Sequence, residues 1–88
     1  MVSKNIFIAV SEETYYNWSE KSVLGVFLSA VRAKNAIIFD SKNGVKAGVP
    51  HSWHILKAGV NYGEKPPKKI YEYEYVHEKK CVIPKRLS

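Results

Sequence analysis

The chain has 88 residues, 45% of them hydrophobic and 25% charged, a composition that suits one small folded domain and excludes disorder throughout. Lysine and arginine number 14 against 8 acidic residues, which gives a formal net charge of +6. A single cysteine excludes an internal disulfide, and the apolar run at residues 6–10 is far shorter than the roughly 18 residues of a membrane span. We therefore expect one cytoplasmic domain over residues 1–88, with a flexible tail at 84–88.

The excess positive charge lies in the second half of the chain. Residues 1–40 hold four basic and four acidic side chains, whereas residues 41–88 hold nine lysines and Arg86 against four glutamates. This asymmetry indicates an anionic partner that is attracted over a distance. A solvated basic surface that only keeps a small protein soluble is the alternative interpretation, and the sequence leaves both open.

The first 40 residues predict a strand, a helix and a second strand. Residues 5–10 are apolar on both faces, which is typical of a central strand that is covered on both sides. Ser11, followed by two acids, is typical of a helix start. The apolar stripe of residues 19–34 predicts the main helix, either continuous from Ser11 or separate. Residues 36–39 predict the second strand.

The second half predicts further strands joined by turns. Asn43-Gly44 is a hairpin signal, with residues 45–49 as the return strand. Residues 53–60 and 70–77 predict two more strands with a loop between them. In the last strand three tyrosines alternate with glutamates, and the glutamate face is the one suited to solvent. The three tyrosines are Tyr71, Tyr73 and Tyr75, and at least two of them are therefore expected to pack inward.

These elements predict an α+β fold. We expect a mixed or antiparallel sheet of four or five strands, beginning β–α–β, with one main helix packed on one face. The expected core consists of Ile6, Ile8, Val10, Leu24, Phe27, Leu28, Val31, Ile37, Phe39 and Val76.

Four potential metal ligands form two close pairs, His51 with His54 and His77 with Cys81. The spacing is compatible with a structural zinc site, where two ligands lie on a turn and two on another element. Residues three apart on an extended strand point to opposite faces, so His51 and His54 could share an ion only at a turn. We expect no cofactor, with zinc as the alternative.

No motif predicts catalysis. Asp40-Ser41-Lys42 has the residue types of part of a metal-dependent nuclease motif, but the second carboxylate would have to be Glu13 or Glu20. His77 and Cys81 have the chemistry of a base and a nucleophile, yet the sequence supplies no orienting acid beside them. We therefore expect a non-catalytic protein.

Basic side chains interleaved with aromatic ones predict binding of RNA or DNA, because lysines contact phosphates and aromatic rings stack on bases. Such binding would weaken steeply with salt. The expected binding residues are Lys42, Lys46, Trp53, Lys57, Tyr62, Lys65, Lys68, Lys69, Lys79 and Lys80.

A protein partner is the alternative function. The size and charge also suit an inhibitor or accessory subunit, of the phage or mobile-element type, that docks on an acidic surface of a larger enzyme. A few aromatic or arginine anchors dominate such interfaces, and Trp18, Trp53 and Tyr62 are the candidates. Their exposure in the folded protein discriminates between the two functions. The sequence predicts no oligomeric state.

Overall fold

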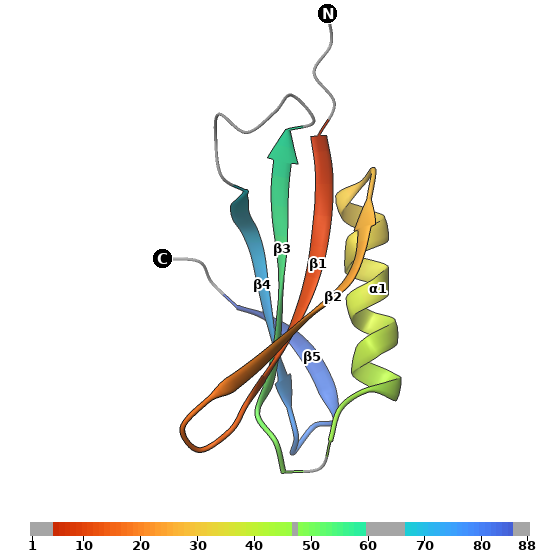
Figure 1. The fold of residues 1–88 in the computed structure, drawn as a ribbon. Helices are drawn as coiled ribbons and strands as arrows, with labels where there is room; N and C mark the ends of the chain where they lie inside the picture. The colour runs from red at the N-terminus through yellow and green to blue at the C-terminus, as the bar shows by residue number, and fades with distance from the viewer. Residues whose placement is uncertain (1–4, 47, 60–66, 86–88) are drawn as a thin grey trace, which may run out of the picture.

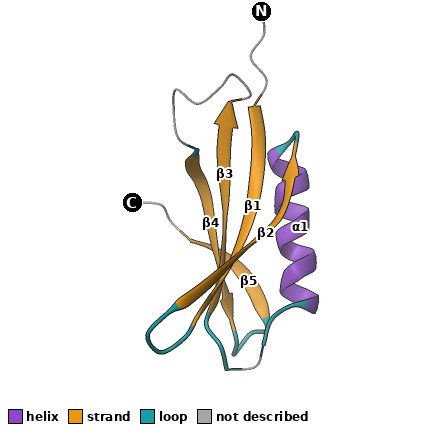
Figure 2. Ribbon diagram, in the orientation of Figure 1, coloured by secondary structure: helices purple, strands orange, loops and turns teal. Residues whose placement is uncertain are grey.

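The computed structural model describes residues 5–46, 48–59 and 67–85. One helix lies against one face of a five-stranded antiparallel sheet with the strand order β2-β1-β3-β4-β5, so the predicted α+β class and sheet are confirmed (Figures 1 and 2). The elements are β1 (Asn5–Thr14), β2 (Ser19–Phe27), α1 (Ala30–Asn43), β3 (His51–Gly59), β4 (Lys68–Val76) and β5 (Cys81–Lys85).

The first half of the chain forms a hairpin and not the predicted β–α–β unit. β1 and β2 pair from Phe7 opposite Phe27 to Thr14 opposite Ser19, with a bulge that leaves Leu24 without an opposite residue. The prediction of a helix over residues 19–34 is therefore wrong for residues 19–27, whereas residues 30–34 form the start of α1. The apolar residues of β2 fit the two-residue period of a strand once the bulge is included. A short apolar run is compatible with both the strand period and the helix period of 3.6 residues.

The helix lies further along the chain than predicted. Ser29 caps it by accepting a hydrogen bond from the Arg32 backbone N–H at 3.2 Å. The helix includes the predicted strand at residues 36–39, and the predicted hairpin turn at Asn43-Gly44 is its C-terminal end, where Gly44 N–H donates to the Asp40 carbonyl at 2.6 Å. No return strand forms among the described residues of the 45–49 segment.

The later strands follow the prediction more closely. β3 and β4 lie where strands were expected, and β5 was not predicted because Pro84 was interpreted as the end of the ordered chain. Proline is tolerated on an edge strand, and Pro84 lies opposite Tyr73 on the edge of this sheet. Residues 84 and 85 thus belong to β5, while 86–88 lie outside the described residues.

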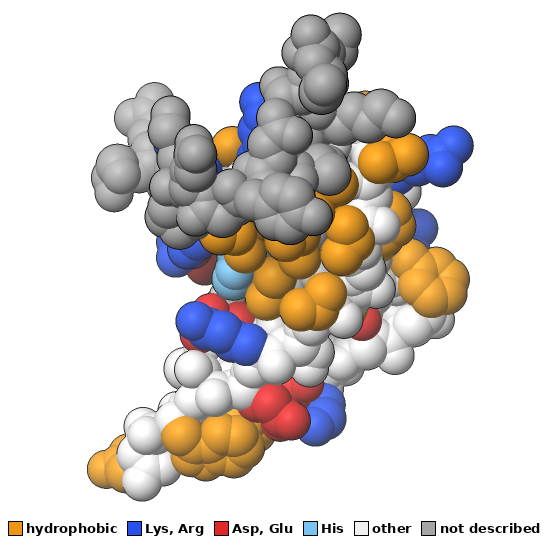
Figure 3. Space-filling model, turned by 45° about the horizontal axis from the view of Figure 1, so that its top comes forward, with side chains coloured by type: hydrophobic (Ala, Val, Ile, Leu, Met, Phe, Trp, Pro, Cys, Tyr) orange, Lys and Arg blue, Asp and Glu red, His pale blue; other side chains and the backbone are white. Residues whose placement is uncertain are grey.

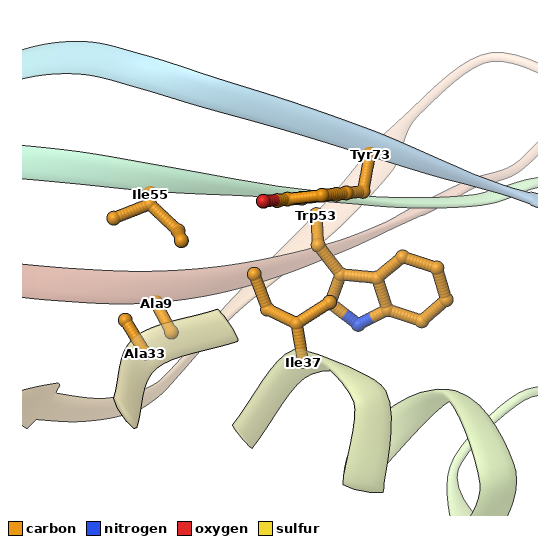
Figure 4. Packing of buried hydrophobic residues seen from close by; sticks show 6 residues of the cluster. All are labelled: Ala9, Ala33, Ile37, Trp53, Ile55 and Tyr73. Atoms are coloured by element: carbon orange, nitrogen blue, oxygen red, sulfur yellow. The ribbon is translucent and has the colours of Figure 1, made fainter. Parts of the chain in front are cut away.

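The core lies between α1 and the centre of the sheet (Figure 4). It consists of Ala9, Ala33, Ile37, Trp53, Ile55 and Tyr73. Of the predicted core, Val10 and Ile37 are buried, and Leu24 and Phe27 are partly buried against this cluster. Ile6, Ile8 and Val76 are also only partly buried. Leu28, Val31 and Phe39 are exposed. Leu28 lies between β2 and α1, and the other two lie on α1, which buries Ala33 and Ile37 instead.

Candidate functional site

A groove runs along one side of α1, between the helix and the β4–β5 half of the sheet. Three adjoining hollows of about 230, 380 and 520 Å³ form it. The first two share Lys34, Tyr71 and Tyr73, and the last two share Ile38 and Val82. The groove exists because α1 packs mainly over β1 and β2, so that β4 and β5 extend beyond it. We call it the tyrosine groove.

Three tyrosines of β4 border this groove. Tyr71 lies opposite Ile55 and Tyr73 opposite Trp53, which places both rings on the helix side of the sheet, and Tyr75 follows on the same face. The prediction that at least two of the three tyrosines pack inward agrees with the structure, in which Tyr73 is buried and Tyr75 is partly buried. Tyr73 is buried, and burial raises the pKa of its phenol. Tyr71 is 48% exposed, so part of its side chain is open to a ligand.

The charge of the groove has one sign. Lys34 lies at one end of the lining, and Lys42 and Lys80 lie at the other. Among the described residues that line the three hollows, none is a carboxylate. The glutamates of β4 point away, since Glu72 lies opposite His54 and Glu74 opposite Ser52 on the other face of the sheet.

A pair of lysines continues the basic surface past Tyr71. Lys57 and Lys68 lie directly opposite one another on β3 and β4, on the face that also carries Tyr71. Both side chains are exposed. Like charges directly opposite on neighbouring strands destabilise a sheet, so this position favours a bound anion.

The other predicted binding residues are dispersed. Trp53 is fully buried, which corrects its predicted role as an exposed binding or anchoring residue. Lys46 Nζ lies 3.3 Å from Glu13 Oε2, and Lys69 lies on the far face of the sheet, with Nζ 3.9 Å from Glu72 Oε1. Lys79 is exposed in the turn between β4 and β5. Two further predicted residues lie outside the described residues: Tyr62 and Lys65.

The four potential zinc ligands do not converge. His51 stacks on Trp53 on the helix side of β3, whereas His54 lies opposite Val10 and Glu72 on the other face. His77 borders a hollow of about 280 Å³ together with His51, but its Nε2 lies 2.8 Å from the Val49 carbonyl oxygen. Cys81 is exposed at the start of β5. Within the described ranges, no three His, Cys, Asp or Glu side chains are grouped to hold a metal ion.

A polar cluster beneath the helix joins Ser11, Asp40, His51 and Trp53. Ser11 Oγ lies 3.0 Å from His51 Nε2, and Asp40 Oδ2 lies 3.8 Å from the same nitrogen. A catalytic triad needs the acid and the hydroxyl on opposite ring nitrogens, and here Ser11 is also buried. Asp40 Oδ2 accepts a hydrogen bond from Trp53 Nε1 at 2.9 Å. This geometry orients the indole and imidazole rings in the core and exposes no nucleophile.

Sequence reasoning missed the helical wall of the groove. Val31, Lys34, Ile38 and Lys42 lie along it. They follow the i, i+3, i+7, i+11 spacing of one helix face, a signal that was present in the sequence. It was overlooked because residues 36–39 alone are apolar enough to predict a strand.

The tip of the β1–β2 hairpin was missed as well. Tyr15 N–H donates to the Trp18 carbonyl at 2.8 Å, and the two rings stack with centroids 4.3 Å apart. The Tyr15 hydroxyl donates to Glu13 Oε2 at 2.5 Å, which lowers the pKa of Glu13, and Lys46 Nζ lies 3.4 Å from that hydroxyl. Tyr16 is fully exposed. The hairpin projects from the body of the molecule (Figure 1), and hydrophobic side chains lie at its end (Figure 3).

Comparisons with known proteins do not add an identification. No protein-family model, no curated protein and no solved structure matches the chain. Within the described ranges, α1 is too short and too polar to cross a bilayer.

Proposed function

We propose that this protein is a non-catalytic binding protein that holds single-stranded RNA or DNA in the tyrosine groove. One observation carries the proposal: the described lining combines three tyrosines with three lysines and no carboxylate. The glutamates that alternate with these tyrosines lie on the opposite face of the sheet. Tyrosine rings and lysines on one surface are the two groups that single-stranded nucleic acids bind.

Each group has a distinct role. The ammonium groups of Lys34, Lys42 and Lys80 neutralise phosphates along the strand, and the Lys57–Lys68 pair accepts a further phosphate at the end of the groove. The half-exposed ring of Tyr71 stacks on a base. A base in a duplex has its faces covered by its neighbours, so the stacking contact favours a single strand.

A comparison of two triple variants tests the proposal. K34Q/K42Q/K80Q removes three charges from the groove, and K21Q/K69Q/K85Q removes three charges from the opposite face. We expect the first variant to bind a fluorescent 20-nucleotide single strand at least about tenfold more weakly, and the second to change affinity by less than about threefold. Equal losses would mean that only net charge matters and would refute the groove as the site.

Salt dependence and a tyrosine variant distinguish the lysine–phosphate contacts from the tyrosine–base contact. Raising the salt concentration should weaken binding by the wild-type protein, and the slope should be reduced by about two to three counterions in K34Q/K42Q/K80Q. Tyr71→Ala should weaken binding by about 1–3 kcal/mol while leaving the salt slope unchanged, because stacking releases no counterions. Absence of binding at low salt would refute the proposal.

A protein partner is the second candidate function, and the hairpin tip is the observation that favours it. Tyr16 and Trp18 are exposed at the end of a projecting hairpin, with Tyr15 held beneath them. Rigid aromatic side chains are typical anchors of protein interfaces. The carboxylates of Glu13 and Glu20, which lie next to the tip, would repel a phosphate group, so the tip is less suited to nucleic acid than to a protein. A host protein that is captured by the wild-type chain, lost with Y16S/W18S and retained by K34Q/K42Q/K80Q would support this function.

A further inference from the structure

The sheet face opposite α1 is an apolar surface. Figure 3 shows hydrophobic side chains gathered together there, with a histidine and a lysine–glutamate group beside them. We call this surface the open face. The strand register places its apolar residues on β1, β2 and β3: Ile6, Ile8, Val10, Val23, Val26, Leu56 and Ala58.

The apolar residues of the open face form continuous rows across the sheet. Val26, Ile8 and Leu56 lie opposite one another in one row, and Val23, Val10 and His54 in the next. Val23 is 65% exposed and Val26 57% exposed. These β-branched side chains on neighbouring rows offer an exposed apolar surface of the kind that sheets bury against one another.

Residues 6–10 of β1 are apolar on both faces, and the described elements cover only one of these faces. Phe7 and Ala9 point into the core beneath α1, while Ile6, Ile8 and Val10 point to the open face. No described element of this chain lies over the open face. A strand without a polar side is typical of a sheet that is covered on both faces, so the sequence itself indicates a second layer.

The charges on the open face are balanced. Its three lysines and three glutamates are Lys21, Lys69, Lys85, Glu12, Glu72 and Glu74. Lys69 Nζ lies 3.9 Å from Glu72 Oε1, and Lys85 Nζ lies 3.8 Å from Glu72 Oε2. The whole chain has a formal charge of +6, so two copies repel one another on average. A charge-balanced face is the one through which like-charged copies can meet.

We propose that the open face binds the open face of a second copy, which gives a twofold symmetric sandwich of two sheets. A face that combines an apolar patch on β1, β2 and β3 with charges of both signs can complement a second copy of itself about a twofold axis. Four strands of nine or ten residues and β5 of five, spaced ~4.8 Å apart, give a face of roughly 20 by 30 Å at most, about 600 Å² in projection. That projected area is of the same order as the ~800 Å² of accessible surface that each partner buries in a stable interface.

This dimer is independent of the proposed nucleic-acid site. The tyrosine groove lies on the α1 side of the sheet, so both grooves of the dimer would face outward. A monomer could still bind a strand in its groove, and a dimer could form in a protein that binds no nucleic acid. Failure of one proposal therefore leaves the other standing.

The test is the mass of the nuclease-treated protein in solution, measured by light scattering and sedimentation over a range of concentrations at high salt. We expect the wild type to have twice the mass of the chain and V23K/V26K to have the mass of one chain, because four lysines would be buried between the sheets. V31K/F39K is the control, since it adds the same charge at two exposed apolar residues of α1, on the other side of the sheet, and should remain a dimer.

Three outcomes would overturn the proposal. They are a wild-type monomer at all concentrations, a dimer that persists in V23K/V26K, and dissociation of the V31K/F39K control to the same degree as V23K/V26K. A persisting dimer would indicate pairing through the edge strands β2 or β5. The emission of buried Trp53 reports whether each variant is folded, so a monomer mass is interpreted only with native emission.

Discussion

Asp40 on α1 accepts a hydrogen bond from the buried indole Nε1 of Trp53 on β3, with 2.9 Å between Oδ2 and Nε1. In Figure 4 the indole nitrogen of Trp53 points toward the helix. The largest side chain of the core therefore has its one polar atom satisfied by the helix that covers it. The same carboxylate lies 3.8 Å from His51 Nε2, and the His51 ring stacks on the indole.

Asp40→Ala should destabilise the protein by about 1–3 kcal/mol, because it leaves the buried indole N–H without an acceptor. Asp40→Asn should cost less, since the amide oxygen still accepts the hydrogen bond. The free energy of unfolding in urea, followed by tryptophan emission, measures both variants. Equal stability of Asp40→Ala and the wild type would show that the hydrogen bond contributes nothing to the fold.

Gly44→Ala should also destabilise the protein, although Gly44 does not have a positive φ angle. A Cβ atom at this position would lie 2.6 Å from Asp40 Oδ1, so the carboxylate would have to move. Because Trp53 holds that carboxylate, we expect a loss of about 1–2 kcal/mol in urea unfolding. The loss should be much smaller when Gly44→Ala is introduced into Asp40→Ala, and additive losses would contradict the mechanism.

Stability should fall as the pH falls below about 7. Burial lowers the pKa of His51 and of His54 below the ordinary value of 6.5. The unfolded chain therefore binds protons near pH 6.5 that the folded protein does not yet bind, and protonation favours unfolding. Urea midpoints measured from about pH 7.5 to about pH 5.5 should decrease, with a shallower decrease in H51Q/H54Q. An unchanged slope in that variant would assign the effect to other groups.

The two tryptophans should respond differently to a soluble quencher. Trp18 is 55% exposed at the hairpin tip, whereas Trp53 is fully buried. Acrylamide should therefore quench the emission of Trp53→Phe strongly and that of Trp18→Phe weakly. Trp18→Phe should change the free energy of unfolding by less than about 0.5 kcal/mol, because the ring lies on the surface. Similar quenching of both variants would contradict the described burial.

Sequence reasoning succeeded where the local pattern had one solution. In β4 the alternation of tyrosine and glutamate allows only a strand, and it also separates the aromatic from the acidic face. Two of the three lysines that line the groove, Lys42 and Lys80, were predicted as binding residues, and Lys34 was not.

It failed where short apolar runs fit two periods. Residues 19–34 contain apolar positions at helical spacing, but the segment that becomes β2 is decided by its pairing with β1, a long-range contact that no local pattern contains. Trp53 was predicted as a binding residue because aromatic residues alternate with lysines along this part of the sequence. Its burial depends on the position of α1, which the same error had misplaced.

Because tyrosine and glutamate alternate in β4, the register of this strand decides which of the two residue types faces the groove. A bulge at Ile70 sets the pairing of Tyr71 with Ile55 and of Glu72 with His54. Sliding β4 by one residue would turn Glu72 and Glu74 into the groove and its tyrosines out onto the other side. Many single substitutions would leave this surface recognisable, whereas inserting or deleting one residue ahead of Tyr71 would replace an aromatic, cationic groove with an anionic one. For this strand, length is constrained more tightly than the identity of any one side chain.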